Sequence, residues 1–198
     1  MKRAPKHAVK KAAKSRSVRP AARPRPVPIP FDPELDLQFE RVVDVAPQDI
    51  YDAWTKPALI VKWFTPAPWK TIAAKTDLRP GGVFHNVMQS PEGQQFPNTG
   101  SFLELIPGRR IVWTGALGPG FRPRAQTALP PGAFVFTAVL TFTPKGKRTR
   151  YHAHLMHTDA EGRKVHEGMG FEAGWNAALD QLVAMVHARR RRYGRLAP

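Results

Sequence analysis

Residues 171–186 read FEAGWNAALDQLVAMV, and the spacing of the apolar side chains in this stretch decides the fold. They recur at steps of three and four, which places them on one face of an α-helix. We therefore predict a helix over residues 164–190, close to 40 Å long at a rise of about 1.5 Å per residue. The stripe consists of Phe171, Trp175, Ala178, Leu179, Leu182, Val183 and Val186.

Short strand-like runs separated by turns precede this helix. We predict strands over residues 71–78, 83–89, 98–106, 111–116, 134–143 and 148–157. Most of the connections are short and rich in Gly or Pro, such as RPGG at 79–82 and PKGK at 144–147. Short connections join strands that are neighbours in a sheet, so we expect one antiparallel sheet. The longer loop at 117–132 is expected to be a lid or a mobile excursion.

The chain before these strands predicts one more strand and two short helices. Residues 35–45 alternate between polar and apolar side chains, as a strand does. Pro47 suits the first position of a helix, because the missing N–H has no partner there. Ile50 and Trp54 recur at helical spacing, and Pro57 ends or kinks that helix.

This order of elements predicts an α+β fold in which a curved antiparallel sheet is wrapped around one long C-terminal helix. A twisted sheet of this size curls, and one helix covers only part of its concave face. We expect the uncovered part to form an apolar ligand cavity, although aromatic residues on a strand face are core residues far more often than ligand contacts. The predicted lining is Trp63, Phe84, Met88, Trp113, Phe136, Tyr151, Met169 and Trp175.

The net charge of +16 comes almost entirely from the two ends of the chain. Residues 1–30 contain ten Lys or Arg, six Pro and no acidic residue, and residues 189–198 contain five Arg. We predict a disordered basic Pro-rich arm over 1–31, one domain over 32–188 and a basic tail over 189–198. The domain itself is nearly neutral, so nucleic-acid reading is not its expected function. The arm is expected to bind polyanions weakly and nonspecifically, or to act only as a solvated tail.

Compartment and partners follow from what the sequence lacks. There is no Cys, which excludes disulfides and thiol chemistry. No apolar run reaches the roughly 18 residues of a membrane span, and the N-terminus lacks the apolar core of a secretory signal. The basic, acid-free start also fits an organelle transit peptide, but its prolines oppose an amphipathic helix. We expect a cytoplasmic protein and no cofactor, and we leave the oligomeric state open.

Histidines are the most promising chemical groups in the sequence. His152 and His154 share a strand face opposite Tyr151, Ala153 and Leu155, so we expect both imidazoles to face solvent. A metal site needs three or four converging ligands, which the sequence does not require, so we predict no metal.

His166 and Glu167 are the candidate acid–base pair, at the start of the long helix. An ordinary polar pair at a helix terminus is the favoured explanation, because an acidic residue is favourable at a helix N-terminus. We name no catalytic residue: the glycines at 81–82 do not precede a helix, and the serines outside the arm, Ser90 and Ser101, make an unconvincing nucleophile.

These motifs resemble the SRPBCC or START-like helix-grip superfamily, in the branch named after the C-terminal domain of the heat-shock-90 ATPase activator. The resemblance rests on the early helix APQDIYDAWTKP at 46–57, on DLRPGG at 77–82 and on HEGMGFEAGWNAALDQL at 166–182. It spans residues 36–187 and implies a helix-grip fold. The family shares no catalytic residues, so the resemblance implies none here.

The resemblance leaves three functions open. The first is binding of a small hydrophobic or aromatic ligand in the cavity, without strong catalysis. The second is a polyketide cyclase or aromatase-like enzyme that folds a reactive chain by shape. The third is a chaperone ATPase-activator-like interaction module.

Overall fold

A computed structural model of the chain describes residues 29–125 and 133–194. The predictions for residues 1–28 and for the second half of the 117–132 loop lie outside these residues. Contacts divide the chain into Met1–Pro30 and a compact unit from Phe31 onward, and this second unit contains every helix and strand described below.

The elements follow the order that the sequence predicts. The first half of the unit contains β1 (Asp36–Val43), α1 (Pro47–Thr55), α2 (Pro57–Ile60), β2 (Lys70–Thr76), β3 (Val83–Gln89), β4 (Gln95–Ile106) and β5 (Arg110–Thr114). The second half contains β6 (Leu117–Gly118), the 3-10 turn η1 (Pro119–Phe121), β7 (Arg122–Pro123), β8 (Phe136–Lys145), β9 (Arg148–His157), α3 (Ala160–Gly168) and α4 (Phe171–Gly194).

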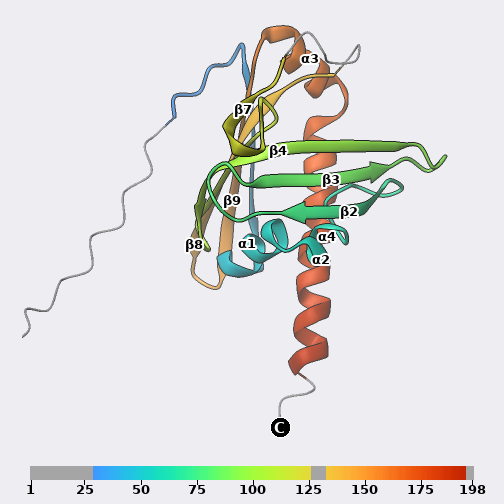
Figure 1. Cartoon of the computed structure of the whole chain (residues 1–198). Coiled ribbons are helices and arrows are strands. Elements are labelled where there is room, and N and C mark those ends of the chain that lie inside the picture. Colours follow the sequence, from blue (N-terminus) through green and yellow to red (C-terminus); the bar gives the residue numbers. More distant parts are fainter. Residues whose placement is uncertain (1–28, 126–132, 195–198) are drawn as a thin grey trace, which may run out of the picture. The chain divides into compact units, whose positions relative to one another are not determined.

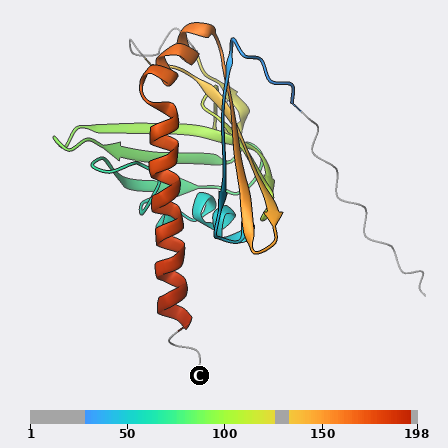
Figure 2. The same cartoon turned by 180° about the vertical axis from the view of Figure 1, so that it is seen from behind.

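Seven strands form one antiparallel sheet in the order β1-β9-β8-β5-β4-β3-β2. The sheet is curved and strongly twisted, so that β2, β3 and β4 lie across the direction of β1 and β9, and α4 passes along β1 and across β2–β4 (Figures 1 and 2). This confirms the predicted α+β helix-grip fold. The start of the predicted lid loop instead forms a small second sheet of β6 and β7.

One face of the large sheet is apolar from strand to strand. Cα partners in neighbouring strands share a face, and residues two apart in one strand share a face. Following the register across six strands gives one line of residues: Phe84, Gly100, Phe102, Trp113, Ala138, Leu155 and Leu37. All of these except half-buried Trp113 are buried. We call this the concave face, because α4 packs over it through Leu179, Leu182 and Val186.

The single helix predicted over 164–190 is two helices. Asp159 caps α3 by accepting a hydrogen bond from the Gly162 backbone N–H at 2.7 Å, so the helix begins earlier than predicted. Gly170 then adopts a left-handed φ of +84°, which ends α3 and starts α4 in a new direction. α4 continues to Gly194 and therefore includes the four consecutive arginines at 189–192.

Polar contacts fix α4 against the sheet and the loop after α2. The side-chain amide of Gln181 donates to the carbonyls of Trp63 and Thr65 at 2.8 and 2.9 Å and accepts from the Ala67 N–H at 3.0 Å. Arg41 of β1 pairs with Asp180 at 2.8 Å. The apolar stripe and these contacts hold the same helix face toward the sheet. None of the helices in residues 29–125 and 133–194 is long and apolar enough to cross a membrane.

Candidate functional site

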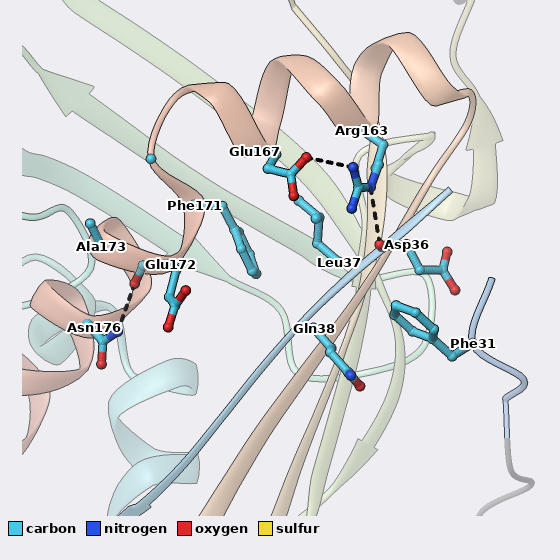
Figure 3. A pocket seen from close by; sticks show the side chains of 11 residues that line it. Phe31, Asp36, Leu37, Gln38, Arg163, Glu167, Phe171, Glu172, Ala173 and Asn176 are labelled. Atoms are coloured by element: carbon cyan, nitrogen blue, oxygen red, sulfur yellow. Dashed lines mark hydrogen bonds and ion pairs between the residues drawn. The ribbon is translucent and has the colours of Figure 1, made fainter. Parts of the chain in front are cut away.

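An open hollow of ≈ 710 Å³ lies beside the edge strand β1, where α3 turns into α4. Its apolar walls are Phe31, Leu37 and Phe171, and Figure 3 shows the side chains of α3 and the start of α4 facing those of β1 across it. Three of its charged side chains already have partners. Arg163 donates to Glu167 at 2.6 Å, and Asp36 lies 2.7 Å from Nε2 of His154.

The hollow is not lined by any of the eight residues that the sequence predicts for the ligand cavity. Three of these, Trp63, Phe84 and Tyr151, are buried in the hydrophobic core. Burial raises the pKa of Tyr151 well above its ordinary value, so its hydroxyl keeps its proton. These three rings help to fill the space between sheet and helices, as aromatic core residues do.

Three other predicted residues, Trp113, Phe136 and Trp175, are only half-buried and pack at the margin of the core. They belong to a closed series of ring contacts with centroid separations of 5.0 to 6.3 Å. We call this series the aromatic cluster; its members in order are Trp113, Phe136, His166, Phe171, Trp175, Trp54 and Phe84. The cluster joins β3, β5 and the start of β8 to the first turns of α4.

The two methionines of the predicted lining lie elsewhere. Met88 is half-buried on β3, on the same face as Phe84 but four residues further along the strand. Met169 is 73% exposed, so the prediction that it lines an internal cavity is wrong. The physical reason is the break at Gly170: Met169 is the C-cap of α3, not part of the apolar stripe of α4.

Two polar atoms on the concave face have no hydrogen-bond partner among the described residues. They are the side-chain oxygen of Asn86, which is 3% exposed, and the indole N–H of Trp113. Asn86 follows Phe84 on the same face of β3, and the rings of Phe84 and Trp113 lie 5.0 Å apart. A buried polar group without a partner costs about 1–3 kcal/mol, so its presence in a protein needs an explanation.

The prediction that His152 and His154 both face solvent is wrong for His154. His154 is 6% exposed because Asp36 and the ring of Phe31 cover it at the edge of the sheet. His152 is half-buried, and burial lowers its pKa. Period-two alternation identifies the face of each residue but cannot show whether a second layer covers that face.

His166 lies against His157 and not against Glu167. Nδ1 of His166 is 2.9 Å from Nε2 of His157, and the ring of Phe134 stacks on it at a centroid distance of 4.5 Å. Burial, and to a smaller extent His157, lowers the pKa of His166 to about 4. Glu167 is exposed and paired with Arg163, so the structure does not bring the two proposed acid–base groups together.

Sequence reasoning missed several members of this region: His157 as the partner of His166, Phe171 and Trp54 as cluster rings, and Asn86. The alternation of side chains along β9 was sufficient to place His157 on the inward face, because it shares that face with buried Tyr151, Ala153 and Leu155. The sequence carries no signal for Asn86. Among the residues that the structure describes, no three His, Asp or Glu side chains converge as metal ligands.

Comparison with known proteins supports the fold and identifies a family whose model matches most of the chain. Residues 44–187 match the family model described as Activator of Hsp90 ATPase homolog 1-like protein. The crystal structure of a protein from Nitrosomonas europaea is 40% identical, covers 81% of this chain and 99% of its own, and has a TM-score of 0.75.

Two more distant structures share the fold. One from Mycobacterium smegmatis is 24% identical over 77% of this chain and 90% of its own, with a TM-score of 0.62. One from Chromobacterium violaceum is 24% identical, covers 76% of this chain and 96% of its own, and has a TM-score of 0.58. No curated protein sequence matches the chain.

Proposed function

The chain belongs to the family of Activator of Hsp90 ATPase homolog 1-like proteins, whose helix-grip fold supports binding of hydrophobic ligands, and on that premise we propose that it binds a small hydrophobic or aromatic molecule at the aromatic cluster. The ligand covers the half-buried rings of Trp113, Phe136 and Trp175, where the concave face meets α4.

The observation that carries this proposal is the combination of half-buried rings and unpaired polar atoms on one face of the sheet. Trp113 contributes both, because its ring is partly accessible while its indole N–H has no partner among the described residues. The N–H is itself buried, so an apolar molecule satisfies both needs when its body covers the rings and a polar atom at its end enters between them to pair with the N–H. Binding sites of this kind combine apolar walls with a few polar groups that orient the ligand.

Burial of apolar surface supplies the free energy of binding. Each Å² of apolar surface removed from water contributes roughly 25 cal/mol, and indole and phenyl rings present large areas. The rings are held by the sheet and by α4, so little side-chain freedom is lost when the ligand binds.

Calorimetric titration with naphthalene tests the proposal, using one blocking variant and one matched control. Ala178→Phe places a ring on the helix face next to Trp175, where Ala178 is half-buried against the core. Ala177→Phe makes the same change on the exposed side of α4. We expect the native protein and Ala177→Phe to bind naphthalene and Ala178→Phe to lose binding. No binding by the native protein, or equal binding by both variants, contradicts the proposal.

The alternative functions stay predictions. Cyclase-like activity requires a polar group at the ligand, and the His157–His166 pair is the structural feature that favours it. Activation of a chaperone ATPase is suggested by the family's name alone, and stimulation of a purified Hsp90 ATPase would test it. Cytoplasmic location and weak polyanion binding by the arm also stay predictions.

A further inference from the structure

The backbone carbonyl of Leu35 determines which nitrogen of His157 carries the proton. Nδ1 of His157 lies 2.9 Å from this oxygen, and a carbonyl can only accept. Nδ1 of His157 is therefore protonated. In the neutral imidazole the other nitrogen, Nε2, is then an acceptor with a free lone pair.

This assignment passes on to His166. Nδ1 of His166 lies 2.9 Å from the acceptor Nε2 of His157, so Nδ1 of His166 must donate and carry its proton. In neutral His166 the remaining nitrogen, Nε2, is an acceptor. It makes no hydrogen bond to any residue that the structure describes, whereas every other nitrogen in the pair is used.

Both imidazoles are neutral at pH 7. Burial lowers the pKa of His157 and lowers the pKa of His166 to about 4. The charged groups near the pair act on His157: Asp36 of β1 and Asp159 raise its pKa, and Arg163 of α3 lowers it. The acceptor state of His166 is therefore the state present in neutral solution.

Aromatic rings surround the acceptor. The His166 ring is half-buried, contacts Phe134, Phe136 and Phe171 at centroid distances of 4.5 to 5.2 Å, and is a member of the aromatic cluster. The ring of Phe136 in turn contacts Trp113 at 5.2 Å. A flat ligand that covers Phe136 and Trp113 has its edge within reach of His166.

We propose that Nε2 of His166 is a hydrogen-bond acceptor for an O–H or N–H group on an aromatic ligand, so that the site prefers phenol-type molecules over hydrocarbons of the same shape. This inference rests on the proposed function and specifies its ligand class. His166 contacts the ligand, and His157 is a positioning residue that holds His166 in the accepting tautomer.

Calorimetric titrations with 1-naphthol and naphthalene at pH 7 test this preference, because the two molecules differ by one hydroxyl group. His166→Phe keeps a ring in the cluster and removes the acceptor. We expect the affinity for 1-naphthol relative to naphthalene to fall about fivefold in this variant, as loss of one neutral hydrogen bond implies, while naphthalene binding itself is retained. His152→Phe is the control: it makes the same substitution on the face of β9 that points away from His157 and the cluster. This variant should keep the native ratio of affinities for 1-naphthol and naphthalene.

The results distinguish failure of the acceptor role from failure of the binding function. An unchanged ratio in His166→Phe, with both probes still bound, overturns the acceptor role and leaves the binding function standing. Failure of the native protein to bind either probe overturns the proposed function and this inference with it. A ¹⁵N spectrum of the native histidines provides a check without any variant: both side chains should show the Nδ1–H tautomer, and an Nε2–H signal for His166 would overturn the assignment.

Discussion

The imidazole of His166 shows how a single side chain takes its properties from its neighbours. In water its pKa would be near 6.5, but burial among rings and contact with His157 lower it to about 4. Desolvation disfavours the cation, because the ring stack offers no charge to balance it. The residue that the sequence offers as an acid–base candidate is therefore a neutral group in the fold above about pH 4.

A linked pH dependence of stability follows for His166. Between pH 6.5 and about 4 the unfolded chain binds a proton on this side chain and the folded chain does not, so the free energy of unfolding falls as the pH falls. His166→Phe removes the titrating group, so the free energy of unfolding of this variant should fall less between pH 7 and pH 5 than that of the native protein. Urea unfolding of both proteins at pH 7 and pH 5 measures the difference, and parallel pH profiles contradict the assignment.

Single residues are also where sequence reasoning was least reliable. Trp63, Phe84 and Tyr151 were predicted as ligand contacts and lie in the core, and Met169 lies in solvent. Alternation and helical spacing assign a side chain to a face, but burial depends on which distant element covers that face. His154 is buried because Phe31 and Asp36, more than a hundred residues earlier, pack over it.

At the level of elements, most boundaries were predictable because they depend on local chemistry. Pro47 stands at the start of α1 and the RPGG turn joins β2 to β3, both as predicted, and α1 ends at Thr55, just before Pro57. Pro57, which was predicted to end or kink the first helix, also begins α2. A Cβ at Gly82 would clash with the backbone carbonyl oxygen of Asp77, so the turn requires glycine. The break between α3 and α4 was missed. The helix that contains the apolar stripe was extended backward through Gly170 to residues 164–169, which belong to α3 and its C-cap and do not continue the stripe.

Two glycine substitutions test this break. Gly170 has a φ of +84°, so Gly170→Ala should destabilise the fold by about 1 kcal/mol or more. Gly174 lies inside α4 with open space around its Cβ position, so Gly174→Ala should stabilise the fold by about 0.5–1 kcal/mol. Thermal or urea unfolding distinguishes the two signs. A stabilising Gly170→Ala would mean that α3 and α4 are one continuous helix.

For the molecule as a whole, the sequence predicted the sheet, the long helix and their order, because each depends on a long periodic pattern. It could not predict how the rings divide the concave face between core and site. That division depends on the register of six strands, which brings residues as distant as Phe84 and Leu155 onto one face. The proposed site keeps three of the eight predicted lining residues, Trp113, Phe136 and Trp175, which pack at the margin of the core.

Removal of residues 1–30 tests the organisation of the whole chain. The compact unit begins at Phe31, so we expect the melting temperature to change by less than about 2 °C, which corresponds to at most roughly 1 kcal/mol for a domain of this size. The deletion removes ten positive charges, so retention on heparin at low salt should weaken. A large drop in melting temperature, or unchanged retention, contradicts the predicted organisation.

The central claim is that an aromatic or apolar molecule binds at the aromatic cluster. The indole N–H signals of the five tryptophans in a ¹H–¹⁵N spectrum test it directly during titration with naphthalene. We predict saturable shifts of the Trp113 and Trp175 signals and little change at Trp69, which lies outside the cluster beside Phe96. No shift at any indole, or a shift confined to Trp69, would contradict the account.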